Sequence, residues 1–250
     1  MLNNIPVVTK NLLIINVLVY IVMMFGISAG HDMLPFYLST HYFNAPTFEP
    51  YQIVTHMFTH SPTDIFHIVF NMLLLVMFGS HLERIWGPKR YFIFYFACGI
   101  GALVLYNSIG MIQIHQLKQA LMAEGYNMAV VDEYLWGGHV KQLPILTPNS
   151  QELFNAYSEM VFSSMAGASG AIFGLLAAFA VLFPNTQLML LFPPIPVRAK
   201  YLIGGYIAYE VYKSFSAPTD NIAHLAHVGG AIVGIVLVLI WRKIDRVNFY

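Results

Sequence analysis

Long apolar stretches with almost no charged side chains dominate this sequence of 250 residues. Six of them are long enough to be candidate membrane-crossing helices, at about residues 11–29, 64–82, 91–110, 161–183, 199–215 and 222–241. Because no water reaches the hydrocarbon core, backbone polar groups there must bond within the protein, which favours helices over irregular chain. Charged residues make up only 10% of the chain, against about a quarter in an average soluble domain. The sequence therefore predicts an all-α membrane protein with a bundle of six transmembrane helices.

The fifth stretch is the weakest of the six, because it is short and contains Glu210. The distribution of basic residues nevertheless supports it. If all six stretches cross the membrane, nine basic residues fall on one side: Lys10, Arg84, Lys89, Arg90, Arg198, Lys200, Arg242, Lys243 and Arg246. Three fall on the other side: Lys118, Lys141 and Lys213. Because positive charge is enriched on the cytoplasmic side, both termini are predicted to be cytoplasmic.

Two of the segments on the outer side are long. Residues 30–63 contain no Lys or Arg but several aromatic residues and prolines, which is typical of a loop at the membrane interface. Residues 111–160 are more polar, and 114–135 could form a short helix within this outer loop. A proline-rich loop is expected between the fourth and fifth spans. The first apolar run is too long for a cleaved signal peptide and is expected to stay as a membrane anchor. No internal repeat, low-complexity tract or soluble second domain is apparent, so residues 1–250 are expected to form one membrane domain.

The overall charge and the cysteine content add little about partners. The formal net charge is zero, which gives no argument for nucleic-acid binding, so the lipid bilayer is the partner that the composition predicts. The single cysteine cannot form a disulfide within the chain.

Four polar side chains lie near the outer ends of three predicted spans, where polar groups are costly and often functional. His67 and Asn71 belong to the second span, Ser169 to the fourth and His227 to the sixth. These three spans run inward in the predicted orientation, so the four side chains lie roughly 5–13 Å below the outer ends of their helices. Three separate segments thus bring Ser, His, His and Asn to one depth, which indicates a site within the membrane.

Local spacing indicates how these side chains could meet. His67 and Asn71 are four residues apart and share one helical face. Pairs of small residues predict that the fourth and sixth spans pack closely: Gly170 with Gly174, and Gly230 with Gly234. Close packing would bring Ser169 within hydrogen-bond reach of His227, as a nucleophile and its base require. Phe173, one turn after Ser169, could hold the imidazole by stacking.

Each of these features also has a purely structural interpretation. A serine among small residues more often packs against a neighbouring helix, and glycine pairs alone indicate only tight packing. Several histidines near the interface are interpreted as amphipathic anchors without a role in chemistry: His31, His41, His56, His115 and His139. His224 is interpreted as support for the bundle. Because Ser169, His227, His67 and Asn71 all lie at one depth, a functional site is favoured over the structural interpretation of each residue alone.

Three motifs together resemble the rhomboid proteases. They are Gly167-Ala168-Ser169-Gly170, His227-x-x-Gly230-x-x-x-Gly234 in the last span, and His67-x-x-x-Asn71 in the second span. The run Glu83-Arg84-Ile85-Trp86-Gly87 resembles the turn that ends the same helix in that family. The resemblance extends from about residue 45 to 240, and the motifs follow the family's order on the expected helices.

This resemblance implies an intramembrane serine endopeptidase with a rhomboid-like bundle. Ser169 would attack the scissile carbonyl and His227 would take its proton, as a dyad without an acidic third member. The backbone N–H of Ser169, with His67 and Asn71, would form the oxyanion hole, and Phe173 would pack on the histidine. His60 resembles an upstream histidine of the family's loop, although the segment before His67 is two residues longer here.

The resemblance also implies the substrates and the location. Substrates would be membrane proteins that are cut near the outer end of a transmembrane segment. A six-span core without a seventh helix resembles bacterial members, which suggests the bacterial inner membrane. The segment 111–160 is longer than in the basic bacterial form.

A multi-pass haem or metal protein, or a transporter, is the alternative class. His67 and His81 are fourteen residues apart on the second span, a spacing that can place two imidazoles on one face at opposite sides of the membrane. The sixth span offers no matching pair, since His224 and His227 both lie near its outer end. The sequence contains no His-Glu-x-x-His motif, and no pair of broken helices in inverted halves is apparent. We therefore expect neither a metal nor a cofactor.

Overall fold

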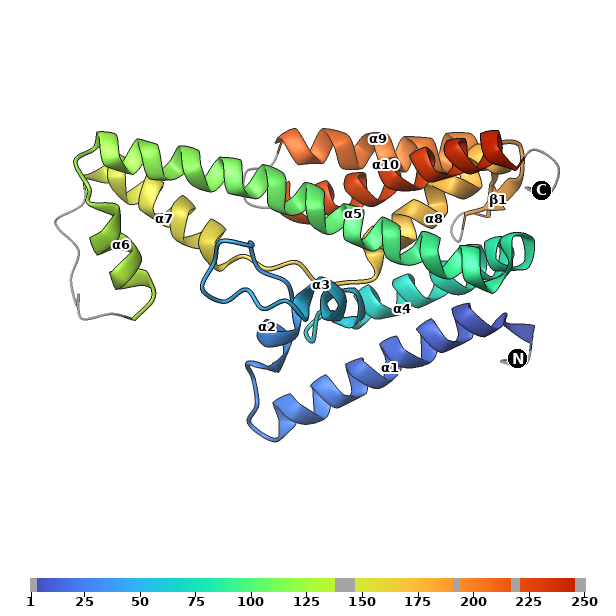
Figure 1. Cartoon of the computed structure of the whole chain (residues 1–250), viewed down its shortest axis with the longest axis horizontal. Coiled ribbons are helices and arrows are strands. Elements are labelled where there is room, and N and C mark those ends of the chain that lie inside the picture. The colour runs from blue at the N-terminus through green and yellow to red at the C-terminus, as the bar shows by residue number, and fades with distance from the viewer. Residues whose placement is uncertain (1–3, 138–146, 191–193, 217–220, 246–250) are drawn as a thin grey trace.

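The computed structural model of the chain describes residues 4–137, 147–190, 194–216 and 221–245. These residues form mainly helices and one short two-stranded sheet (Figure 1). The longer helices are α1 (Val7–Ser28), α5 (Ser80–Ala123), α7 (Pro148–Phe162), α8 (Ser169–Leu182), α9 (Ala199–Ser216) and α10 (Asn221–Ile244). The shorter ones are α2 (Leu34–Leu38), α3 (Gln52–Thr55), η2 (His56–Phe58), α4 (Ile65–Leu74), η3 (Leu75–Gly79) and α6 (Met128–Leu135).

Three described helical stretches are long and apolar enough to cross a membrane: Val7–Ser28, Ile65–Ala123 and His224–Ile244. The second stretch reverses its direction at Gly87, whose φ of 77° lies in the left-handed region that glycine adopts without strain. Pro88 then begins the returning part, as suits the first position of a helix. Figure 1 accordingly shows α4 running towards one end of the molecule and most of α5 running back.

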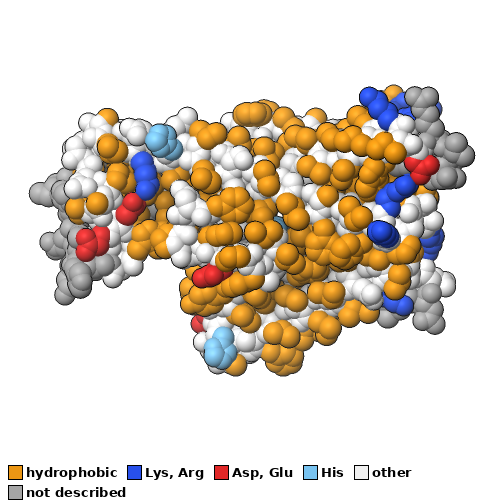
Figure 2. Space-filling view, viewed as in Figure 1, with side chains coloured by type: hydrophobic (Ala, Val, Ile, Leu, Met, Phe, Trp, Pro, Cys, Tyr) orange, Lys and Arg blue, Asp and Glu red, His pale blue; other side chains and the backbone are white. Residues whose placement is uncertain are grey.

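Apolar side chains cover the middle of the molecular surface, and charged side chains gather towards its two ends (Figure 2). Phe25, Phe66 and Phe215 are among many large apolar residues that are mostly exposed. An apolar surface of this extent is unfavourable in water but is the ordinary surface of a protein in lipid. The chain is a multi-pass membrane protein.

Helix α8 lies at the centre of the fold, where it packs against α5, α9 and α10. It is apolar on all sides, and nearly all of its residues are buried. The backbones of α8 and α10 touch, because a methyl group built on Gly230 would lie 1.8 Å from the carbonyl oxygen of Gly170. The same construction on Gly234 would place the methyl 2.7 Å from the carbonyl oxygen of Gly174. The two glycine pairs therefore make the close helix contact that their spacing predicts.

The expected span 161–183 is wrong at its N-terminal end. Helix α7 ends at Phe162, and the next helix begins only at Ser169. The segment between them pairs with distant chain: Thr40 and Met165 exchange two backbone hydrogen bonds of 2.9 Å each, and the N–H of Gly167 donates to the carbonyl of His56 at 2.8 Å. A continuous helix would need these same backbone groups, so the long-range bonds interrupt it.

The expected outer loop 111–160 is largely helical where it is described. Helix α5 continues to Ala123, so the short helix expected at 114–135 is broken in two at Gly125, which has a φ of 92°. Asp132 on α6 accepts a 2.9 Å bond from the Lys118 ammonium on α5 and a short bond from the Tyr157 hydroxyl on α7. These bonds join the three helices. Part of the expected loop, 138–146, lies outside the described residues.

The proline-rich connection between α8 and α9 contains a hairpin that the sequence does not predict. Strand β1 (Gln187–Met189) pairs antiparallel with β2 (Pro196–Arg198), in the register Gln187 with Arg198.

The turn between α4 and the returning part of α5 is tied to the start of α1. The Glu83 carboxylate accepts hydrogen bonds from the N–H groups of Val8 and Thr9 at 2.9 and 2.7 Å, at the end of α1 where such donors have no helical partner. Arg84 donates to the carbonyl of Asn4 at 2.6 Å.

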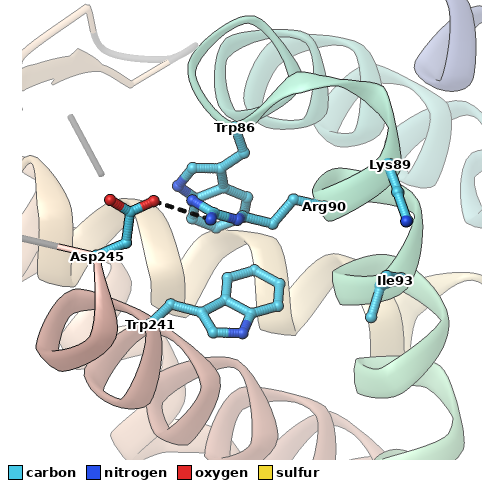
Figure 3. Close-up of a pocket in the computed structure, with 6 residues that line it drawn as sticks. All are labelled: Trp86, Lys89, Arg90, Ile93, Trp241 and Asp245. Atoms are coloured by element: carbon cyan, nitrogen blue, oxygen red, sulfur yellow. Dashed lines mark hydrogen bonds and ion pairs between the residues drawn. The ribbon is translucent and has the colours of Figure 1, made fainter. Parts of the chain in front are cut away.

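The same turn is tied to the end of α10. Arg90 pairs with Asp245 at 3.0 Å, beside the rings of Trp86 and Trp241 (Figure 3). The start of α1 and the end of α10 therefore lie at the same end of the molecule, as Figure 1 also shows.

Candidate active site

Ser169 is the first residue of α8 and follows a backbone turn that only glycine adopts easily. Gly167 has a φ of 126°, a conformation that side chains rarely allow. The first N–H groups of a helix have no carbonyl partner within it, and the helix dipole makes this end positive. The hydroxyl of Ser169 thus stands beside unpaired backbone donors, an arrangement suited to an anion.

His227 on α10 lies beside Ser169. Its Nε2 atom is 2.9 Å from Ser169 Oγ, within hydrogen-bond distance. The ring of Phe173 stacks on the imidazole, with ring centroids 4.2 Å apart and planes only 9° from parallel. The contact between Gly170 and Gly230 brings the two helices close enough for this bond.

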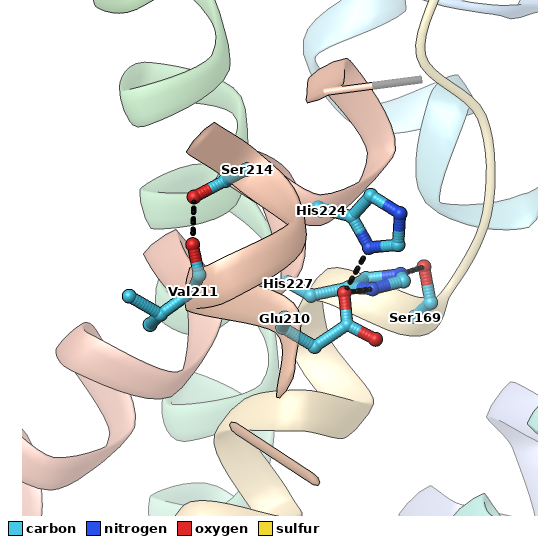
Figure 4. A network of polar contacts seen from close by, with 6 residues as sticks. All are labelled: Ser169, Glu210, Val211, Ser214, His224 and His227. Atoms are coloured by element: carbon cyan, nitrogen blue, oxygen red, sulfur yellow. Dashed lines mark hydrogen bonds and ion pairs between the residues drawn. The ribbon is translucent and has the colours of Figure 1, made fainter. Parts of the chain in front are cut away.

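A buried carboxylate, which the resemblance did not imply, completes a chain of three polar groups (Figure 4). Glu210 on α9 is only 3% exposed, and its Oε2 atom lies 2.8 Å from His227 Nδ1. The dyad that the resemblance implies has no acidic third member, so a carboxylate beside the imidazole is a feature that the resemblance did not predict. The sequence contained one signal, because a carboxylate within an apolar span is costly and usually marks function. In the sequence alone, Glu210 counts only against the fifth apolar stretch as a membrane span.

His224 also belongs to this group of polar side chains. Its Nδ1 atom lies 2.6 Å from the same oxygen of Glu210, so two imidazoles share one carboxylate oxygen. From the sequence, His224 was expected only to support the bundle. Its contact with Glu210 was not predicted.

His67 faces the space beside Ser169. Its Nδ1 atom accepts a 3.2 Å bond from the N–H of Ser61, which assigns the ring proton to Nε2. A methyl group built on Gly167 would lie 3.0 Å from His67 Nε2 and 3.4 Å from Ser169 Oγ. A side-chain donor thus lies close to the serine hydroxyl, on the other side of the space that a Gly167 methyl would fill.

Asn71 is buried, but its amide is turned towards its own helix. Its Nδ2 atom donates to the carbonyl of His67 at 2.6 Å. One amide hydrogen remains for another acceptor. His67 Nε2 and Ser169 Oγ therefore both border the space beside Gly167, whereas the amide of Asn71 bonds within its own helix.

His60 is buried, and its ring lies next to the ring of His67, with the two centroids 5.2 Å apart. Its Nδ1 donates to the carbonyl of Phe58 at 3.3 Å, and its Nε2 has no partner among the described residues. Burial lowers the pKa of His60 to about 4, so the ring is neutral at neutral pH.

One set of side chains has the composition of a metal site. The ligand atoms of Glu210, His224 and His227 all lie within 4.8 Å of one another. A metal held there would take the Nδ1 lone pair of His227 and displace its bond to Glu210.

The haem alternative paired His67 with His81. The ring of His81 contacts the rings of Phe179 and Phe183.

Comparison with known proteins places the chain in a family. The rhomboid domain matches residues 47–115 and 145–244, which is more than half of the chain. The RHOMBOID-like protein 12, mitochondrial, of Arabidopsis thaliana is 27% identical over 198 residues, or 79% of this chain and 47% of that protein. The Rhomboid protein 1, mitochondrial, of Saccharomyces cerevisiae is 23% identical over 189 residues, or 74% of this chain and 40% of that protein.

The chain spans less than half the length of these two relatives. Both are named as mitochondrial proteins, so the comparison does not support the expected location in a bacterial inner membrane. The domain match covers α8 and α10, which carry Ser169 and His227. It also covers α4, which carries His67. The chain belongs to the rhomboid family.

Proposed function

We propose that this protein is an intramembrane serine endopeptidase in which Ser169 is the nucleophile and His227 is the general base. The observation that carries this proposal is the 2.9 Å separation of His227 Nε2 and Ser169 Oγ, with the imidazole held from behind by Phe173. A nucleophile next to an oriented base is the arrangement that activates a serine hydroxyl.

The reaction follows from the positions of these groups. Ser169 Oγ attacks the carbonyl carbon of the scissile peptide bond while its proton passes to His227 Nε2. His227 then returns that proton to the leaving amine, the C–N bond breaks, and an ester to Ser169 remains. A water molecule attacks the ester while His227 takes one of its protons. His227 then passes this proton to Ser169 Oγ as the ester C–O bond breaks, which releases the carboxylic acid and restores the serine hydroxyl.

Negative charge develops on the carbonyl oxygen during each attack. The N–H of Ser169 at the start of α8 and the Nε2–H of His67 would donate to this oxygen. Neutral donors are effective there because the apolar surroundings screen their dipoles weakly. Asn71 would add its remaining amide hydrogen from the next turn of α4.

The depth of Ser169 suits a cut within a transmembrane segment. Gly170 packs on Ala102, near the middle of α5. Ala102 follows Pro88 by fourteen residues, or roughly 21 Å of helix. If the turn at Gly87 lies at the inner surface of a hydrocarbon core about 30 Å thick, Ser169 lies about two thirds of the way to the outer side. Substrates would be membrane proteins, cut in the outer part of a transmembrane segment.

The proposal includes a specific topology. Six spans, formed by α1, α4 with the first part of α5, the returning part of α5, α8, α9 and α10, would place both termini on the cytoplasmic side. The ties from the turn at Gly87 to Asn4 and Asp245 support this arrangement. Nine of the twelve basic residues fall on that side by sequence position.

Cleavage of a generic single-span substrate by the purified protein in liposomes tests the activity. We expect cleavage by the wild type and none by Ser169→Ala or His227→Ala, with a double variant no worse than either single one, since the pair acts as a unit. Ser163→Ala is the matched control, because Ser163 lies six residues earlier and its hydroxyl donates to the carbonyl of Met160 in its own turn. Ordinary turnover by Ser169→Ala would contradict the proposal, as would an inactive wild type.

A further inference from the structure

We propose that Glu210 is a positioning residue for this reaction, which extends the Ser169–His227 pair to a triad of serine, histidine and glutamate. The inference rests on the proposed function. It goes beyond that function because the rhomboid resemblance implies a dyad without an acidic member.

The tautomer of His227 follows from its two contacts. An ionised carboxylate can only accept hydrogen bonds, so the 2.8 Å contact with Glu210 Oε2 requires the proton on His227 Nδ1. The lone pair is then on Nε2, 2.9 Å from Ser169 Oγ, where it can take the hydroxyl proton. The opposite tautomer would present an N–H to the serine and could not act as the base.

The second imidazole explains how a carboxylate is tolerated in this place. A buried charge is costly unless it is paired and hydrogen-bonded. His224 donates to the same oxygen of Glu210 at 2.6 Å, so two N–H groups stabilise the carboxylate. His224 precedes His227 by three residues, and the two therefore lie on one face of α10, opposite Glu210 on α9.

The carboxylate also acts on the charged intermediate state. When His227 takes the serine proton, the ring becomes a cation in an apolar surrounding of low dielectric. Glu210 lies against that cation and stabilises it, and the stabilisation is stronger there than in water. The interaction between Glu210 and His227 becomes stronger only after proton transfer. Removing the carboxylate is therefore expected to lower kcat and to leave KM little changed.

Glu210→Gln tests the charge without changing the shape of the side chain. We expect kcat to fall at least about tenfold, with KM changed less than about threefold. The loss should be smaller than the roughly 10⁴-fold loss known for the acid of a soluble serine protease, because Phe173 still holds the ring. Glu210→Asp should recover part of the lost kcat, since it restores the charge at a longer distance.

Glu83→Gln is the matched control, because Glu83 is an equally buried carboxylate, at 3% exposure, that bonds the start of α1. This variant should lower the melting temperature and leave the kcat of the folded protein unchanged. Wild-type kcat in Glu210→Gln would overturn the inference. So would equal losses of kcat in the two variants, because the loss would then follow from burial alone.

A measurement without turnover separates the inference from the proposed function. Nitrogen-15 NMR of labelled histidine reports which ring nitrogen carries the proton, and His227→Asn identifies the signals of His227 by their loss. In the wild type we expect the proton of His227 on Nδ1, and in Glu210→Leu on Nε2. The proton on Nε2 in the wild type, or on Nδ1 in both proteins, would overturn the role of Glu210. An inactive wild type with the expected NMR result would instead overturn only the proposed protease activity.

Discussion

At the scale of single residues, the site combines groups of two kinds around Ser169. In the proposed mechanism, His227 takes the proton of Ser169 and Glu210 stabilises the imidazolium that forms. In the same mechanism, His67 and the backbone N–H of Ser169 are the donors for developing negative charge. The first kind acts on the nucleophile and the second on the carbonyl oxygen, so substitutions should separate them.

His67→Ala and Asn71→Ala should lower activity to different extents. His67 faces the serine, so its loss should lower kcat at least about tenfold, and by no more than the roughly 10²–10³ known for one oxyanion donor. Asn71 donates to its own helix, so its loss should cost less. Substrate KM should change little in both.

Labelling of Ser169 by a small fluorophosphonate distinguishes these losses from unfolding. It should persist in both variants at a lower rate, because the serine and its base are intact. A variant with full kcat and a lower melting temperature would show that its residue serves only the structure.

At the scale of elements, the contact between α8 and α10 holds the nucleophile against its base. Neither helix provides the site alone, since Ser169 and His227 are 58 residues apart in the chain. The glycines at the crossing permit an approach that any side chain would prevent.

Gly230→Ala should separate the two helices. The added methyl would lie 1.8 Å from a carbonyl oxygen on α8, which rigid backbone cannot relieve by a rotamer change. We expect a lower melting temperature and a large loss of cleavage, measured on the same preparation. Gly205→Ala on α9 is the control, because its methyl would meet nothing within 4 Å. Full activity of Gly230→Ala would show that the site does not depend on this crossing.

At the scale of the whole molecule, the bundle has two polar ends and an apolar middle. The start of α1 and the end of α10 share one end, and the group α6 and α7 lies at the other (Figure 1). This arrangement predicts that the two ends face opposite sides of the membrane.

Cysteine labelling tests this orientation in sealed cells of a bacterial host. A cysteine at exposed Ala129 on α6 should react with a membrane-impermeant reagent, and one at exposed Lys243 near the end of α10 should not. The native Cys98 is fully buried and gives a low background. The reversed pattern would contradict both the positive-inside assignment and the outer position of the cut.

The sequence by itself determined the helical membrane class, the positions of the main apolar helices and the meeting of Ser169 with His227. Apolar runs and glycine spacing are local patterns, and lipid leaves the chain few structures other than helices. The pairing of His227 with Ser169 was predictable because both lie next to glycine pairs that force their helices together.

Two features were decided only by the tertiary structure. The break before Ser169 depends on backbone bonds to Thr40 and His56, more than a hundred residues away, so the local apolar pattern continued the helix wrongly. The contact of Glu210 with His227 depends on the rotation and register of α9 against α10. Propensity and periodicity describe one helix at a time, and the relative placement of two helices is fixed by packing across their whole interface.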